Sequence, residues 1–405
     1  MRQAVEVLTP AGAELLGKLG GVEVTPETAL RLADELREQY PPSLVAAALT
    51  QQSLRTAARD KFSRAGEMFF TRAGLEQASP ELVARRSASR FAGLDLVADL
   101  CCGIGGDLAA LAGAARSVLA VDADPEAVAF ARRNVAAHHP AASVIFVCAD
   151  VRDLVLGAGV QAVFVDPARR VGERRLRAGD SQPPMDWCLT LAGQVPRVCI
   201  KAAPGLPREL VPPGWEAEFV ALGRDLKEAL LWSPAFATAE RRATVLRPAV
   251  AGGTVPAGRP GQPGHDTLVP EQGAAVPVAD PGGYLLDPNP AVTRAGLVAE
   301  LGCRLGAWQI DPMIAFLSLD EPVTTPFART LRVIESMPWH EREVARRLRD
   351  LGIGSADLRR RGLAGDVEQI RRRLGLVGNR AATIVLTRHR DRPWCIICEA
   401  VPTAD

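Results

Sequence analysis

The sequence predicts an α/β fold in which a parallel sheet alternates with helices. One observation is a series of four short apolar segments, each followed closely by an aspartate, at residues 94–98, 117–121, 144–148 and 162–165. Another is the helix signals between them, namely an apolar segment at 108–112 and an aspartate and proline ahead of 126–135. Strands that alternate with helices pair in parallel. Their carboxyl ends therefore meet at one edge of the sheet, where ligands bind.

The first strand leads into a glycine-rich loop, Asp-Leu-Cys-Cys-Gly-Ile-Gly-Gly-Asp, at residues 99–107. A strand that breaks at glycines and continues as a helix lets the backbone approach a ligand closely, because glycine has no Cβ. Nicotinamide-dependent dehydrogenases share this arrangement, but Leu108 occupies the position of their third glycine. The pair Asp166-Pro167 also has no role in hydride transfer. The sequence therefore disfavours a dehydrogenase.

The loop, the aspartates at the strand ends and their spacing resemble the class I S-adenosylmethionine-dependent methyltransferases. The resemblance implies a Rossmann-like, seven-stranded methyltransferase sheet, with S-adenosyl-L-methionine as the cofactor. It implies that Asp99, Gly103 and Gly105 lie beside the methionine moiety, whose ammonium needs an acceptor, and that Cys101 belongs to the same cofactor loop.

Three further aspartates receive roles from the same resemblance. Asp122 would accept hydrogen bonds from both ribose hydroxyls, and Asp150 from the adenine amine, with Val151 packing near the ring. Asp107 either reaches the cofactor or only fills the first helical turn, where the helix dipole favours a negative charge.

The segment Asp166-Pro167-Ala168-Arg169 resembles the acceptor motif of the amino-methylating enzymes of this class. That motif has an aspartate or asparagine, two prolines and an aromatic residue that stacks on the base, so Ala168 and Arg169 depart from it. The resemblance implies catalytic roles for Asp166, Pro167 and Arg169, because an arginine plane can stack on a base or pair with phosphate. A charged loop beside a small-molecule site stays the alternative.

Residues 61–90 resemble the lead-in of the trimethylguanosine-synthase-like RNA methyltransferases, in which a strand-like piece and a helix start close over the cofactor. The resemblance implies that Phe70 and Thr71 contact the cofactor. Ser79, followed by Pro80 and Glu81, independently predicts a helix N-terminus with the serine as its cap.

Arginine is concentrated near the C-terminus. Residues 331–392 contain fifteen arginines and eight acidic residues, whereas the whole chain has a net charge of +1. Such a cluster is the electrostatic footprint of a phosphate-binding surface, with a solvated helix face as the alternative. The run from Arg332 to Leu363 resembles the THUMP-like C-terminal domain of bacterial RNA methyltransferases. That resemblance implies RNA, either tRNA or rRNA, as a partner.

We expect four parts along the chain. They are an N-terminal helical region at 1–70 with helices at 26–36 and 42–54, a methyltransferase domain at 71–248, a Gly/Pro-rich linker or loop at 249–282, and a small THUMP-like α/β domain at 283–405 with a helix near 293–301. The last three strands of the methyltransferase sheet are expected at 195–201, 215–222 and 243–246. Lys201 would end the first of these strands and face either the site or the surface. Asp287 to Pro290 reads as a turn.

The composition also disfavours other classes of protein. No apolar run approaches the roughly twenty residues of a membrane span. The first residues, Met1 to Val7, lack a signal-peptide pattern, so we expect a cytoplasmic protein without a membrane partner. Cys395 and Cys398 have no further ligands at suitable spacing, so they read as buried thiols, and we expect no metal.

Together these features predict an S-adenosylmethionine-dependent methyltransferase that modifies a base amine or ring nitrogen in RNA. Two alternatives stay open. A small-molecule methyltransferase would need no basic module. A non-catalytic protein that binds S-adenosylmethionine and RNA would fit the altered pair Ala168-Arg169.

Overall fold

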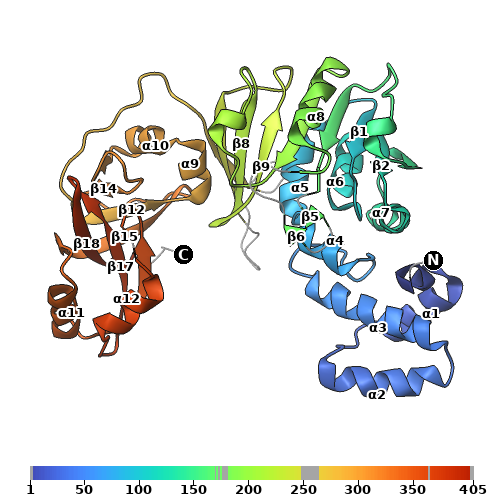
Figure 1. Cartoon of the computed structure of the whole chain (residues 1–405), viewed down its shortest axis with the longest axis horizontal. Coiled ribbons are helices and arrows are strands. Elements are labelled where there is room, and N and C mark those ends of the chain that lie inside the picture. Colours follow the sequence, from blue (N-terminus) through green and yellow to red (C-terminus); the bar gives the residue numbers. More distant parts are fainter. Residues whose placement is uncertain are drawn as a thin grey trace. The chain divides into compact units, whose positions relative to one another are not determined.

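The structure is a computed structural model that describes residues 3–168, 170–171, 174–175, 181–247, 264–363 and 365–401. The described chain divides into two compact units (Figure 1). The first takes in residues up to Ala217 and Lys227–Thr238, and the second takes in Glu218–Leu226, Ala239–Arg247 and the chain from Gly264 onward.

Helices form the N-terminal part of the first unit, drawn in blue in Figure 1. They are the 3-10 helix η1 (Gln3–Leu8) and the α-helices α1 (Pro10–Lys18), α2 (Pro26–Arg37) and α3 (Pro42–Ala57). Proline lies in the first turn of all three α-helices, where its missing N–H leaves no partner unsatisfied, and Thr9 and Thr25 cap α1 and α2. Their apolar faces share one buried cluster. The helices expected at 26–36 and 42–54 are confirmed.

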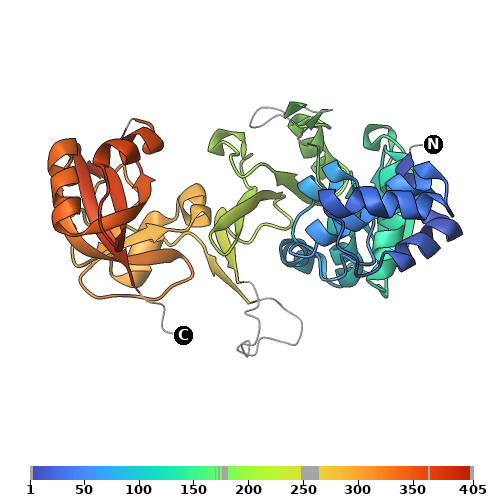
Figure 2. The same ribbon diagram turned by 90° about the horizontal axis from the view of Figure 1, so that it is seen from below.

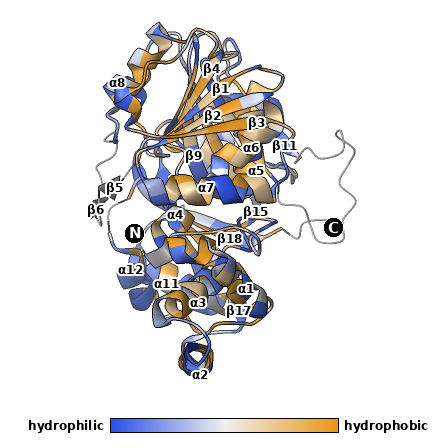
Figure 3. Cartoon of the chain, turned by 90° about the vertical axis from the view of Figure 1, so that its right-hand side faces the viewer, coloured by the Kyte–Doolittle hydropathy of each residue, from blue (hydrophilic) through white to orange (hydrophobic). Residues whose placement is uncertain are grey.

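The sheet that carries the glycine loop has nine strands, in the order β11-β10-β8-β9-β7-β4-β1-β2-β3. Its parallel part consists of β1 (Val97–Leu100), β2 (Ser117–Asp122), β3 (Ser143–Cys148), β4 (Ala162–Val165) and β7 (Arg197–Ala202). All four strands predicted around the glycine loop are therefore present and parallel. The apolar character that predicts them is visible in Figure 3, where β1, β2 and β4 are coloured as hydrophobic.

The rest of that sheet holds the strands expected at 215–222 and 243–246, together with two more, so the sheet has nine strands and not the expected seven. It contains β8 (Glu216–Leu222), β9 (Asp225–Trp232), β10 (Arg241–Leu246) and β11 (His265–Leu268). The sequence does not predict β9, which pairs antiparallel with β7, because Asp225, Lys227 and Glu228 interrupt its apolar pattern. The strand expected at 243–246 is β10, and the stretch expected as a linker contains β11.

Helices follow the strands of the parallel part. β1 leads into α6 (Gly106–Ala114) and β2 into α7 (Pro125–Ala137). Asp124 caps α7, because its carboxylate accepts the N–H of Glu126 at 3.0 Å, as predicted. Shorter elements are α4 (Arg72–Gln77), α5 (Glu81–Ala88), η2 (Ser89–Phe91), η3 (Val151–Asp153), β5 (Arg170–Val171), β6 (Arg174–Arg175), α8 (Met185–Thr190), η4 (Leu191–Gly193) and η5 (Arg208–Leu210). Within the described ranges, no helix has the length and apolarity needed to cross a membrane.

The second unit is built on a seven-stranded sheet with the order β13-β14-β12-β15-β18-β17-β16. Its strands are β12 (Tyr284–Pro288), β13 (Trp308–Gln309), β14 (Leu317–Leu319), β15 (Ala328–Pro338), β16 (Ile353–Arg360), β17 (Arg380–His389) and β18 (Arg392–Ala400). Its helices are α9 (Pro290–Ala295), α10 (Val298–Leu305), α11 (Glu341–Asp350) and α12 (Val367–Leu374). α11 and α12, red in Figure 2, cover one face of this sheet.

Side chains alternate between the two faces of this second sheet. Ile384 and Cys395 belong to the core beneath α11 and α12, whereas Val385 and Cys398 belong to a second core on the opposite face. Both cysteines are free and fully buried, as the sequence predicts.

The segment Asp287 to Pro290 is not a turn, contrary to expectation. Asp287 and Pro288 end β12, and Asn289 caps α9 by accepting the N–H of Ala291 at 3.0 Å. The helix expected near 293–301 is divided in two, because Gly296 adopts a φ of 67° and ends α9.

Two buried amide side chains hold the segment that precedes the nine-stranded sheet. Gln51 accepts the N–H of Phe70 at 2.9 Å and donates to its carbonyl at 2.6 Å. Asn134 on α7 accepts the N–H of Phe69 at 2.7 Å and donates to the carbonyls of Phe69 and Ile104, each at 2.8 Å. Asn134 therefore ties the lead-in segment to the glycine loop.

Replacing Asn134 with alanine leaves three backbone groups without their partner, and each buried unpaired group costs about 1–3 kcal/mol. We expect the free energy of unfolding to fall by about 2–5 kcal/mol, measured by urea denaturation. Asn379→Ala, a change at an exposed position, serves as the control and should change it by less than about 0.5 kcal/mol. Equal stability of the two variants would contradict the proposed tie.

Candidate active site

A cavity of about 320 Å³ lies at the carboxyl ends of β1, β2 and β4. Three groups of residues line it. The lead-in segment contributes Thr71, Ala73, Gly74, Gln77 and Ala78, and the glycine loop contributes Cys101, Cys102, Gly103, Ile104, Gly106 and Asp107. The third group lies at or after the ends of β2 and β4 and consists of Asp122, Asp124, Ala127, Asp166, Pro167 and Ala168. The predicted glycine loop and the predicted acceptor segment therefore share one cavity.

The loop turns because three of its residues adopt positive φ: Cys101 at 63°, Gly103 at 54° and Gly105 at 86°. A Cβ on Gly105 would lie 3.1 Å from the Cα of Ala131, so glycine lets the loop pack tightly against α7. Cys101 is the loop residue that carries left-handed strain, which costs about 1–2 kcal/mol in a residue with a Cβ. Burial, followed by the charges of Asp122 and other nearby carboxylates, raises the pKa of its thiol, so Cys101 is no thiolate nucleophile.

Asp122, the last residue of β2, is fixed by two backbone donors. Its Oδ2 accepts the N–H of Gly103 at 2.8 Å, and its Oδ1 accepts the N–H of Asp124 at 2.9 Å. Each carboxylate oxygen can accept a further hydrogen bond, so the group keeps capacity for a ligand in the cavity.

Lys201, next to the last residue of β7, contacts one aspartate from each of two segments that line the cavity, the glycine loop and the segment after β4. Its Nζ lies 2.6 Å from Oδ2 of Asp166 and 2.8 Å from Oδ2 of Asp107, and its side chain is 2% exposed. Burial alone would lower the pKa of this amine, but the two carboxylates outweigh burial and raise it. Lys201 is therefore a buried ammonium ion that holds both aspartates in place.

A second buried acid lies close to that ammonium. Glu228 of β9 accepts hydrogen bonds from the hydroxyls of Ser79 at 2.8 Å and Ser87 at 3.0 Å. Burial raises its pKa to about 7, against the opposing effects of Lys201 and of the two serine hydroxyls. Ser79 is thus not the predicted helix cap, because its hydroxyl is used by the buried carboxyl, and α5 begins after Pro80 without a side-chain cap.

Asp99 lies inside β1 and is completely buried. Neither of its carboxyl oxygens has a hydrogen-bond partner among the described residues, and the same holds for Oδ1 of Asp107. Burial and the neighbouring charges of Asp107 and Asp166 raise the pKa of Asp99 well above its usual range. Asp99 is thus a buried acid whose charged form would be favoured by a cationic ligand beside it.

The structure brings seven of the predicted site residues to the cavity: Thr71, Cys101, Gly103, Asp107, Asp122, Asp166 and Pro167. Asp99, Gly105, Asp150, Val151 and Phe70 do not line it. Phe70 is fully buried in the core of the N-terminal helices, and Gly105 is the N-cap of α6. Asp150 pairs with Arg152 at 2.6 Å, and the hydrogen bonds from Arg152 lower the pKa of Asp150 to about 2. Arg169 lies outside the described residues.

Sequence reasoning misses one residue that lines the cavity and leaves Glu228 open, because a charged residue there can face the site but more often faces solvent. Gln77 lines the cavity from α4, and no pattern in the lead-in distinguishes it. Lys201 does carry a signal, since a charged residue that ends an otherwise apolar central strand needs a partner there.

The raised pKa of Glu228 gives a pH dependence with a definite sign. A folded-state pKa of about 7, above the unfolded value, means that the contribution of Glu228 to stability is greatest at low pH. That contribution is lost as the pH rises to about 7. Glu228→Gln cannot ionise, so we expect the stability of the wild type relative to this variant to fall between pH 5 and 8, on the order of 1–3 kcal/mol. Urea denaturation at several pH values measures it, and parallel pH profiles would contradict it.

The fold is similar to that of a solved structure. The crystal structure of a "putative methyltransferase" from Porphyromonas gingivalis W83 superposes with a TM-score of 0.70 at 18% sequence identity. The alignment covers 93% of this chain and 99% of that one, so the likeness extends over both units.

Three segments of the chain match the models of known families. Residues 3–58 match a domain of unknown function, residues 97–171 match the family "Methyltransferase domain", and residues 328–400 match the family "THUMP domain-like". The chain is also 37% identical over 329 residues to an "Uncharacterized S-adenosylmethionine-dependent methyltransferase" of Mycobacterium tuberculosis, in strains CDC 1551 / Oshkosh and H37Rv. That alignment covers 80% of this chain and 85% of the relative. Such identity over so much of the chain means that this protein belongs to the S-adenosylmethionine-dependent methyltransferases.

Proposed function

We propose that this methyltransferase transfers the methyl group of S-adenosylmethionine to an amine or ring nitrogen of a base in RNA. The observation that carries the proposal is the single cavity lined both by the glycine loop with Asp122 and by Asp166-Pro167. A donor and an acceptor bound there would be neighbours, and orientation of two reactants supplies most of the rate in a displacement of this kind.

The residues of the cavity fit this cofactor. S-adenosylmethionine carries a sulfonium and an ammonium group, and Asp99 and Asp107 have buried oxygens without a hydrogen-bond partner among the described residues, which are the acceptors that such an ammonium needs. Asp122, fixed by two backbone N–H groups, is suited to accept the two ribose hydroxyls. We assign Asp150 and Val151 to the adenine end of the site.

The cofactor supplies an electrophilic methyl group, and the protein supplies the geometry. Asp166 would accept a hydrogen bond from the target nitrogen and so direct the nitrogen's lone pair toward the bound cofactor. As the nitrogen takes the methyl group and the cofactor leaves as the thioether, Asp166 or water would take up the proton that the nitrogen loses. Lys201 holds Asp166 in place, because its ammonium lies 2.6 Å from Oδ2 of that carboxyl group.

The assignment to RNA depends on the second unit. Its THUMP-like segment at 328–400 holds most of the arginine-rich stretch, and clustered arginine favours the phosphate backbone of nucleic acids. Ala168 and Arg169 replace the second proline and the aromatic residue of the amino-methylating motif. We propose that Arg169 takes over the stacking role on the base.

Replacing Asp166 with alanine removes the group that orients the acceptor. We expect methyl transfer to total RNA to fall by at least about a hundredfold, because a positioned acid or base typically contributes 10²–10⁴-fold. Affinity for S-adenosylmethionine should stay within a few-fold of the wild type. Transfer of radiolabelled methyl groups and calorimetric titration measure the two quantities.

Asp34→Ala removes an aspartate that is 79% exposed on α2 and should leave both quantities unchanged. Full turnover by Asp166→Ala would overturn the assignment of the acceptor site. Cofactor binding by the wild type without transfer to RNA, including RNA from cells that lack the gene, would instead support a non-catalytic protein.

A further inference from the structure

Four arginines of the second unit share two carboxylates. Asp287 binds Arg224 and Arg361, each at 2.8 Å. Asp357 binds Arg359 at 2.9 Å and Arg329 at 3.5 Å. We call the four guanidinium groups of these arginines the arginine cluster. Because four positive charges face two negative ones, the cluster keeps an uncompensated charge of two.

The cluster lies on one face of the second sheet. Asp287 and Arg329 are directly paired across β12 and β15, so their side chains share a face. Asp357 and Arg359 are two residues apart on β16, and they alternate with Ala356 and Leu358, which belong to the core under α11 and α12. The cluster therefore faces away from those two helices.

The arginines of the cluster are partly buried and held in place. Arg361 lies over the ring of Phe316, 4.7 Å from its centroid, and its side chain is 29% exposed. The pKa of Arg224 is lowered, first by burial and then, against the effect of Asp287, by the guanidinium groups of Arg359, Arg329 and Arg361. The four groups thus repel one another, and an anion that bridges them would relieve that repulsion.

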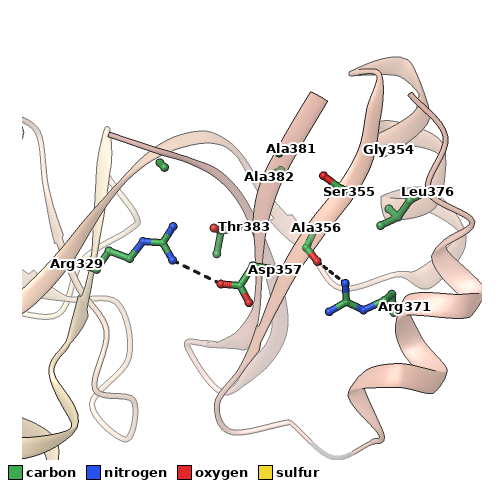
Figure 4. A pocket seen from close by; sticks show the side chains of 11 residues that line it. Arg329, Gly354, Ser355, Ala356, Asp357, Arg371, Leu376, Ala381, Ala382 and Thr383 are labelled. Carbon is green, nitrogen blue, oxygen red and sulfur yellow. Dashed lines mark hydrogen bonds and ion pairs between the residues drawn. The ribbon is translucent and has the colours of Figure 1, made fainter. Parts of the chain in front are cut away.

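A cavity of about 590 Å³ adjoins the cluster. It is lined by Arg329, which belongs to the cluster, and by Asp357, which binds two arginines of the cluster. Figure 4 shows Arg329 and Arg371 reaching toward it from opposite sides, with Thr383 and Asp357 between them. Its other lining residues are small or apolar: Gly354, Ser355, Ala356, Leu376, Ala381, Ala382 and Ala400. The volume is within the range of pockets that take a small ligand, and the hydroxyls of Ser355 and Thr383 can hydrogen-bond one.

We propose that the arginine cluster binds the phosphodiester backbone of a single-stranded RNA segment and that the adjoining cavity takes one of its nucleotides. This inference rests on the proposed function, since it names the surface that would hold the RNA. An unpaired strand is required, because only an unstacked nucleotide can leave its neighbours and enter a cavity, and single-stranded RNA is recognised in this way. The guanidinium groups of the arginine cluster suit the phosphate oxygens on the outside of the same RNA segment, because each group can donate two parallel hydrogen bonds.

The test is fluorescence anisotropy of a labelled single-stranded oligoribonucleotide of mixed sequence, titrated with the full-length chain at several salt concentrations. For the double variant Arg329→Gln/Arg359→Gln we expect at least a tenfold loss of affinity. We also expect the slope of log K against log salt to fall by about 1 to 1.5, since each phosphate contact contributes about 0.7 on a single strand.

Arg342→Gln/Arg346→Gln is the matched control. It removes the same charge from two exposed positions one turn apart on α11, and it should bind within about twofold of the wild type. Cofactor affinity and the thermal midpoint of both variants should equal those of the wild type. A loss in the α11 variant as large as that in the cluster variant would overturn the inference, because net charge rather than this surface would then govern binding.

Ser355→Trp tests the cavity separately, because it fills an exposed lining position without changing the charge. We expect a several-fold loss of affinity with an unchanged salt slope, and unchanged affinity would overturn the assignment of the cavity. If the wild type binds RNA and the cluster variant binds equally well, this inference fails alone. If the wild type binds no RNA, the assignment of RNA in the proposed function fails with it.

Discussion

The buried ion pair of Lys201 with Asp107 and Asp166 is the constraint on which the rest of the site depends. Asp107 ends the glycine loop in the first turn of α6 and Asp166 follows β4, so one ammonium group joins the two parts of the cavity to which we assign the cofactor and the acceptor. Such a pair is costly to desolvate and is retained when its geometry serves something besides stability. Here its geometry brings two carboxyl groups from different elements to one ammonium.

The lead-in segment closes the same cavity from the opposite side. It reaches the site through residues 71–78, yet the groups that hold it, Gln51 and Asn134, belong to helices on either side of it in the sequence. Because both amides are buried and hydrogen-bonded to the backbone of residues 69 and 70, the segment is part of the folded scaffold rather than an independent flap.

The sequence predicts the parallel strands and the glycine loop well, because period, glycine placement and strand-end aspartates are local signals. It does not predict β9, whose first residues are charged, since the hydroxyls that hydrogen-bond the buried Glu228 belong to Ser79 and Ser87, 149 and 141 residues away in the sequence. Ser79 is a second case of a role set by a distant residue. Its neighbours in the sequence predict a helix cap, but its hydroxyl donates to Glu228. The arginine content of the sequence predicts that the second unit binds an anion. Which four arginines share two carboxylates is seen only in the strand pairing and the ion pairs of the folded chain.

The most direct measurement is a calorimetric titration of S-adenosylmethionine into Lys201→Met, together with its methyl transfer to RNA and its stability. Without the ammonium, Asp107 and Asp166 lose their shared partner, and removing one member of a buried pair typically costs about 3–5 kcal/mol. The account predicts weaker cofactor binding and slower transfer together, or failure to fold. A folded Lys201→Met protein that binds the cofactor and transfers methyl groups as the wild type does would contradict it.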